Sequence, residues 1–174
     1  LQYYYHAWSS EIIYFLNQQR SLLALQKAEK MKKQAFADRY PYGIFSCIRT
    51  MGHIYKSRGN FDLSAQYYQE ALDYMLKNMP DQDPSQLYSS LAEYYRNTQK
   101  DYATALDYCE KALKSAKTER NIAQAMIEKC LVLFRQGRID EFNDCYKEAV
   151  QMADRCKLSA SVSLLIAHIS KNLS

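Results

Sequence analysis

Apolar residues recur along the chain at the three- and four-residue spacing of helices that bury one face, and no strand is needed to place them. Breaks between the periodic stretches divide the chain into nine expected helices. They span roughly residues 2–17, 19–37, 42–58, 61–79, 84–99, 102–116, 119–136, 139–155 and 158–172.

Local signals support several of these boundaries. Pro41 disfavours a helical conformation at Tyr40, so one helix should end there and the next begin. Residues 83–86, Asp-Pro-Ser-Gln, resemble a capping box with a proline in the first helical turn. Gly59 and Gly137 stand where two other helices stop and the chain must turn.

The helices also form a repeat. Residues 51–55 and 91–95 each contain a large apolar residue, then a small residue, and a tyrosine three positions after the small one. A turn and a second helix follow, and in that second helix an alanine recurs at intervals of 43, 41 and 37 residues. These alanines are Ala28, Ala71, Ala112 and Ala149. Small residues let antiparallel helices approach closely, and one such pair cannot bury its apolar face alone. The pairs should therefore stack.

Two copies resemble the tetratricopeptide repeat family, whose pattern is W-x2-L-G-x2-Y, then A-x3-F, alanine and proline. The copy at residues 48–72 matches closely, with Ser64 in place of the first alanine. Its matching residues are Met51, Gly52, Tyr55, Gly59, Phe61, Tyr68 and Ala71. The copy at residues 88–113 matches with one extra residue in its turn, around Gln99-Lys100. The outer copies, including the first with Trp8, are looser.

The resemblance implies an all-α fold, a right-handed α-solenoid of antiparallel helical hairpins. We expect about four repeats plus a C-terminal helix in a single domain spanning residues 1–174. Each repeat is longer than the family's usual length of about 34 residues, which implies longer helices and a different curvature.

A narrower likeness points to bacterial signalling. The long repeats, the tyrosine-rich start and residues 39–44 are similar to the repeat-containing sensor regions of bacterial two-component proteins. In those proteins the repeats precede a membrane span and a histidine-kinase or DNA-binding output domain. This segment has neither output motif nor a run of eighteen apolar residues, so it would be the sensor part alone. The missing initiator methionine also suggests a fragment of a longer protein.

Five cysteines stand far apart, and none forms a C-x-x-C pair: Cys47, Cys109, Cys130, Cys145 and Cys156. Their odd number argues against a fully paired disulfide framework. We therefore expect buried free thiols, Cys109 and Cys130 among them, and no intrachain disulfide. This usage favours a cytoplasmic location, whereas a membrane kinase's sensor region would be periplasmic.

Motifs for catalysis and for metal binding are missing from the sequence. The three histidines and the cysteines lack metal-ligand spacing, and there is no G-x-S-x-G or phosphate-binding glycine loop. The net charge of +4 is small, and its densest basic cluster, residues 27–33, spreads around a helix without interleaved aromatic residues. We expect no enzyme, no cofactor and no nucleic-acid partner.

The first helix of each hairpin should line an inner groove. Helical phase places a tentative peptide-binding set on that face: Tyr3, His6, Tyr14, Arg49, His53, Lys56, Glu93, Arg96, Asn97, Phe134 and Arg135. Ile127 and Leu131 share this phase. The arginines and Lys56 would bind carboxylates, and the tyrosines would give flat contacts. Family members that clamp chaperone tails use lysines and asparagines at such places, and His53, Glu93 and Leu131 depart from that set.

The sequence therefore predicts a repeat scaffold that binds a protein or peptide. An ordinary solvated inner face remains an alternative reading of the same residues. A different function would be self-association, with apolar residues of the last expected helix pairing two chains as a homodimer. Those residues are Leu164, Leu165 and Ile169.

Overall fold

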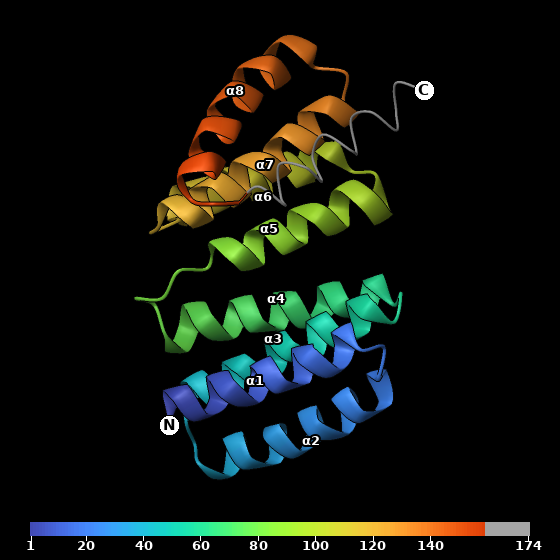
Figure 1. Ribbon diagram of the computed structural model, residues 1–174, viewed down its shortest axis with the longest axis vertical. Helices are drawn as coiled ribbons and strands as arrows, with labels where there is room; N and C mark the ends of the chain where they lie inside the picture. Colours follow the sequence, from blue (N-terminus) through green and yellow to red (C-terminus); the bar gives the residue numbers. More distant parts are fainter. Residues whose placement is uncertain (159–174) are drawn as a thin grey trace. The chain divides into compact units, whose positions relative to one another are not determined.

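The computed structural model describes residues 1–158, which are helical throughout apart from short turns and contain no strand (Figure 1). In chain order the helices are α1 (Gln2–Asn17), α2 (Ser21–Ala37), α3 (Pro41–Ser57), α4 (Phe61–Asn78), α5 (Ser85–Tyr94), the π-helix η1 (Tyr95–Gln99), α6 (Tyr102–Ser115), α7 (Glu119–Arg135) and α8 (Ile139–Arg155). The all-α prediction is confirmed, and the first eight expected helices agree within two residues at each end. The ninth, with Leu164, Leu165 and Ile169, falls beyond Leu158 and so outside the described residues.

The chain divides into two compact units, residues 1–82 and 83–174. In the first unit α1 pairs with α2 and α3 with α4, and α3 also packs against both helices of the first hairpin. In the second unit α5 pairs with α6 and α7 with α8, and α7 packs against both α5 and α6. Each unit is thus two stacked hairpins. The handedness of the stack and the single-domain reading stay predictions.

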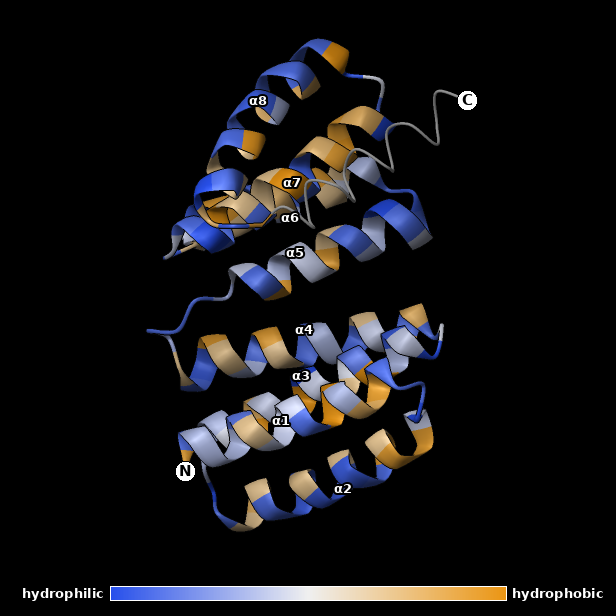
Figure 2. Ribbon diagram, viewed as in Figure 1, coloured by the Kyte–Doolittle hydropathy of each residue, from blue (hydrophilic) through white to orange (hydrophobic). Residues whose placement is uncertain are grey.

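The helices that pack against more neighbours carry more apolar residues, as α7 and α8 show (Figure 2). In the figure α7 shows apolar residues over much of its length, and eight of its residues are buried. By contrast α8 is mostly hydrophilic and buries only three residues. The difference arises because α7 is covered by three helices of its unit whereas α8 pairs chiefly with α7.

Small residues mark the close helix contacts, as the repeat predicts. Ala28, Ala71, Ala112 and Ala149 are all fully buried. At Gly52 a Cβ atom would lie 2.6 Å from Cε1 of Tyr68, so the Tyr68 ring fills the space that a side chain would need. The Ser64 hydroxyl donates a hydrogen bond of 2.8 Å to the Gly52 carbonyl. These contacts bring α3 and α4 together.

The hairpin turns use a left-handed residue after the first helix. Gly59 and Gly137 adopt φ of +75° and +72°, as expected for glycine at a helix end. The Asn60 amide then donates to the Tyr55 carbonyl at 3.0 Å and closes the turn. The same region of φ is occupied by four residues that carry a side chain: Gln19, Arg39, Lys100 and Lys157.

The extra residue of the third hairpin lies in a π-helix. η1 continues α5 with a wider turn and ends at Lys100, where φ is +57°. The Asp101 amide donates to the Tyr95 carbonyl at 3.0 Å across this turn. A π-turn accommodates one inserted residue without ending the helix. It therefore explains why this copy of the repeat is one residue longer in its turn.

The capping box expected at residues 83–86 is replaced by a different contact. The Asp83 carboxylate accepts the Ser85 amide at 2.9 Å, and it also accepts the Lys117 amide and the Asn121 side-chain amide, each at 2.8 Å. Burial raises the pKa of Asp83, but these hydrogen bonds outweigh it and hold the pKa below its usual range. Asp83 thus ties the start of α5 to the turn before α7.

Candidate protein-binding surfaces

A pocket of about 300 Å³ lies between α1 and α3, the first helices of the two hairpins in residues 1–82. Helix α1 contributes His6, Ser9, Ser10, Ile13, Tyr14 and Asn17, and α3 contributes Arg49. Three residues of the expected groove, His6, Tyr14 and Arg49, are therefore brought together. The lining that the structure describes includes no aspartate or glutamate, so no acidic side chain of this pocket pairs with Arg49.

Arg49 is the unusual group in this pocket. Its Nε atom is buried and has no hydrogen-bond partner in the described part of the chain. The guanidinium carbon lies 5.3 Å from the centre of the Phe45 ring, a cation–π contact that replaces only part of the lost hydration. Burial lowers the pKa of Arg49, as it does for any cation that lacks a sufficient partner. A carboxylate could supply the missing hydrogen bonds in a bidentate geometry.

His53 and Lys56 follow Arg49 on the same face of α3, as helical phase predicts. His53 is partly buried, and its Nδ1 atom lies 3.0 Å from the Tyr68 hydroxyl. Burial, followed by the positive charges of Arg49 and Lys56, lowers the pKa of His53 to about 4. The imidazole is therefore neutral near pH 7. It packs α3 against α4 and does not add charge to the inner face.

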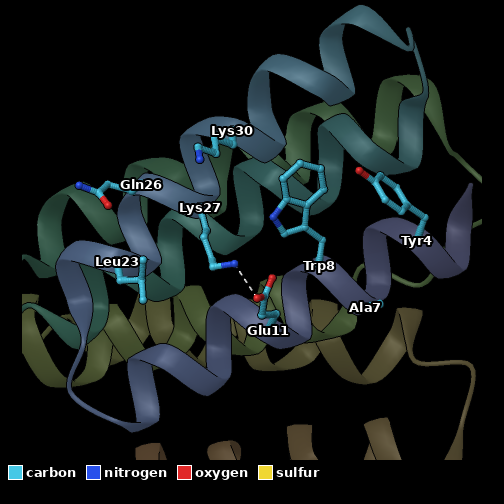
Figure 3. A pocket seen from close by; sticks show the side chains of 8 residues that line it. All are labelled: Tyr4, Ala7, Trp8, Glu11, Leu23, Gln26, Lys27 and Lys30. Carbon is cyan, nitrogen blue, oxygen red and sulfur yellow. Dashed lines mark hydrogen bonds and ion pairs between the residues drawn. The ribbon is translucent and has the colours of Figure 1, made fainter.

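A second, larger groove of about 610 Å³ lies between α1 and α2 (Figure 3). Its lining residues recur at helical spacing on both helices: Tyr4, Ala7, Trp8 and Glu11 on α1, and Leu23, Gln26, Lys27 and Lys30 on α2. Figure 3 shows the Trp8 ring standing over the groove, beside an ion pair of 2.6 Å between Lys27 and Glu11.

No residue of the predicted binding set lines this second groove. One feature of the sequence could have predicted this groove: apolar and aromatic residues at helical spacing in the first, less regular repeat, with Trp8 at its centre. Tyr3 lines neither pocket and is 89% exposed. The tyrosine-rich start therefore divides between a core residue, Tyr5, and exposed neighbours.

In the second unit Arg96 does not extend into a groove, contrary to expectation. It is 4% exposed, and its Nε and terminal nitrogen donate to the two Glu128 carboxylate oxygens at 2.7 and 3.2 Å. Its other terminal nitrogen donates to the Asn97 side chain at 2.7 Å. The guanidinium is therefore used inside the unit, between η1 and α7.

The expected inner face of α7 is also a packing surface. Ile127 and Leu131 are buried in the core that α7 forms with α8. Phe134 packs against that core, with its ring centre 5.5 Å from that of Phe142. Of the remaining predicted residues in this unit, Glu93 is partly buried and two are exposed, Asn97 and Arg135. Whether these residues bind a partner stays a prediction.

Residues 44–118 match the family model described as tetratricopeptide repeat. These residues therefore consist of tetratricopeptide repeats. The match covers the two copies that follow the family pattern best, from α3 to the turn before α7. No curated protein matches the chain. The likeness to two-component sensor regions is not addressed by this match and stays a prediction.

The tetratricopeptide repeats of residues 44–118 indicate the general function. Repeats of this family mediate protein–protein interaction and form non-catalytic scaffolds. Within residues 1–158 no cluster of three or more histidine, cysteine or acidic side chains could hold a metal ion. Over the same residues no helix has the length and apolar character needed to cross a bilayer.

Proposed function

We propose that this tetratricopeptide repeat protein binds an acidic peptide segment on the inner face of its first two hairpins, and that Arg49 holds one carboxylate of that segment. The observation that supports this most directly is the buried Nε of Arg49, without a partner, in a pocket between two first helices. A cation in such surroundings costs free energy unless it is paired. A ligand carboxylate would supply the pairing that the described chain does not.

The dimensions of the pocket favour a side chain or chain end as the bound group. About 300 Å³ is at the lower limit for small-molecule pockets, too small for a large cofactor but sufficient for a carboxylate and its stem. Tyr14 is exposed at the rim and offers a flat surface for the rest of the peptide. Lys56, one turn beyond His53, adds positive charge on the same face of α3.

The test begins with a random peptide display library selected on the chain. Enriched peptides are synthesised, and each acidic residue is replaced in turn by its amide. Binding is measured by isothermal titration calorimetry for the parent chain and for Arg49→Met. We expect enriched peptides to contain aspartate, glutamate or a free C-terminal carboxylate. At the peptide carboxylate that Arg49 binds, replacement by the amide should weaken binding at least tenfold, and so should Arg49→Met with the unchanged peptide. When the two changes are combined, binding should be little weaker than with either change alone.

Lys30→Met serves as the matched control, because Lys30 is an exposed cation lining the other groove of the same unit. It should leave the affinity within about twofold of the parent. Enriched peptides without any carboxylate would contradict the proposal, as would equal affinity for the parent and Arg49→Met. A loss with Lys30→Met alone would assign peptide binding to the α1–α2 groove instead.

Two narrower roles rest on the sequence and are tested separately. A sensor role in a two-component protein is supported by the similarity of residues 39–44 and by the long repeats. It predicts histidine-kinase or DNA-binding motifs in the full-length gene product. Self-association through residues 158–172 predicts a mass that doubles with concentration in light scattering, and a monomer at all concentrations would contradict it.

A further inference from the structure

Two of the five cysteines lie against each other. Cys130 on α7 and Cys145 on α8 have their Sγ atoms 3.0 Å apart, about 1 Å more than the length of a disulfide bond. The other three cysteines are free as well, and none has a sulfur partner in the described residues. Because the two sulfurs already meet across one hairpin, joining them requires only a small shift of the side chains.

The surroundings of the two thiols differ. Cys130 is fully buried and donates its thiol hydrogen to Cys145. Its pKa is raised by that hydrogen bond and by burial. Cys145 is only partly buried, and its pKa is lowered by the same hydrogen bond, with a further contribution from the Lys129 ammonium. Because Cys145 is the more exposed of the two, it is the thiol that an oxidant reaches first, and Cys130 is placed to react with it in a second step.

Lys129 is held in place for this role. Its ammonium forms an ion pair of 2.6 Å with Glu110 of α6, so its position is fixed by a third helix of the unit. The Cys145 sulfur also lies 3.6 Å from the Met126 carbonyl oxygen. A partly exposed thiol in contact with a second cysteine is the arrangement found at redox-sensitive cysteine pairs.

The five cysteines are free thiols in this structure, and the sequence predicts no intrachain disulfide. The contact of the two sulfurs points the other way under oxidation: we propose that Cys130 and Cys145 form a reversible intrachain disulfide, with a peroxide as the oxidant. The Cys145 thiolate attacks a peroxide oxygen, the O–O bond breaks, and a sulfenic acid forms while hydroxide leaves. The Cys130 thiol then attacks the Cys145 sulfur, the S–S bond forms, and the S–O bond breaks to release water. The two sulfurs lose two electrons in total, and the peroxide gains them. A small dithiol reverses the reaction.

The bridge would join the middle of α7 to α8. It closes a short loop of the chain, so it restricts the unfolded state and should raise the melting temperature of the second unit. It also fixes the packing of α8 on α7, the hairpin whose core includes Phe134 and Phe142. Oxidation would therefore make this hairpin more rigid without changing the peptide-binding pocket of the first unit.

The experiment uses the whole chain. After removal of reductant the protein is treated with hydrogen peroxide, unfolded, alkylated, and mapped by mass spectrometry without reduction. We expect two of the five thiols to be lost, a peptide that joins Cys130 to Cys145, and full recovery with dithiothreitol. The oxidised form should melt at a higher temperature than the reduced form in circular dichroism.

Variants identify the order of the steps. Cys130→Ser should accumulate a sulfenic acid at Cys145 that reacts with dimedone, whereas Cys145→Ser should give no dimedone adduct at Cys130. Cys47→Ser is the matched control and should form the bridge as the parent does. A bridge between another pair would overturn the proposal. So would five intact thiols after peroxide treatment, or irreversible oxidation of Cys145 while Cys130 stays free. The mapping of the parent chain decides these outcomes even if a variant fails to fold.

Discussion

Replacing Arg96 with methionine tests the structure of the second unit most directly. Methionine keeps an unbranched side chain of similar length but removes the positive charge. The Arg96 and Glu128 side chains are 3% and 12% exposed, so the Glu128 carboxylate would lose two hydrogen bonds that water could replace only in part. Leaving one member of a buried pair without the other costs about 3–5 kcal/mol. We expect the free energy of unfolding to fall by that amount.

The companion variant removes both charges. Arg96→Met combined with Glu128→Leu removes both members of the ion pair, and apolar replacements of buried pairs are often neutral or stabilising. The double variant should therefore recover most of the loss. This recovery distinguishes the loss of the carboxylate's donors from a cavity, because a cavity at position 96 would persist in the double variant.

Urea unfolding followed by circular dichroism measures these differences for each variant. Arg58→Met is the control, because Arg58 is an exposed arginine at the end of α3, and it should change stability by less than about 0.5 kcal/mol. If Arg96→Met and Arg58→Met unfold with the same free energy, Arg96 is solvated in solution. The expectation of an exposed groove arginine would then be restored.

Four further predictions use the same measurements. Arg49→Met should leave the free energy of unfolding unchanged or raise it, because it removes a buried donor without a partner; a clear loss would contradict this. The pKa of His53 is about 4 in the folded state and about 6.5 in the unfolded state. Between these pH values the unfolded state binds more protons, so the free energy of unfolding should fall by on the order of 3 kcal/mol as pH drops from about 6.5 to 4. In His53→Gln that component should disappear, and an unchanged pH profile would refute the assignment. Lys100→Gly should raise stability by about 1 kcal/mol by relieving the left-handed conformation; a decrease would argue against it. Gly52→Leu should lower stability by about 1–3 kcal/mol or more through overlap with the Tyr68 ring, and an unchanged melting temperature would place the glycine elsewhere.

Helix positions could be predicted from the sequence because local physics determines them. Apolar periodicity, Pro41 and the two turn glycines act within a few residues of one another, so no tertiary information is needed. The left-handed turns at Gln19, Arg39 and Lys100 could not be foreseen in the same way. Glycine and asparagine favour the left-handed conformation, so they predict it from the sequence. Other residues adopt it only because the helices on either side hold them there.

Helical phase predicts which residues share a pocket where the helices are regular. His6, Tyr14 and Arg49 meet in one pocket because α1 and α3 keep the ideal phase. Arg96 lies in η1 and pairs with Glu128 of α7, a contact between two helices that the spacing within one helix does not predict. The contact of Cys130 with Cys145 is set by the packing of α8 on α7, which sequence spacing alone does not determine.

Arg49 and Arg96 differ in how the fold pairs their charge. Both are arginines on the first helix of a hairpin, and both have lost much of their hydration. Arg96 regains its hydrogen bonds from a carboxylate of its own unit, so its charge contributes to the fold and is not available to a ligand. Arg49 has a buried nitrogen that no group of the described chain satisfies, and packing alone would favour an apolar residue there. A buried charge that lowers the stability of the fold is best explained by a partner that pairs with it. The partner would reach Arg49 through the pocket between α1 and α3.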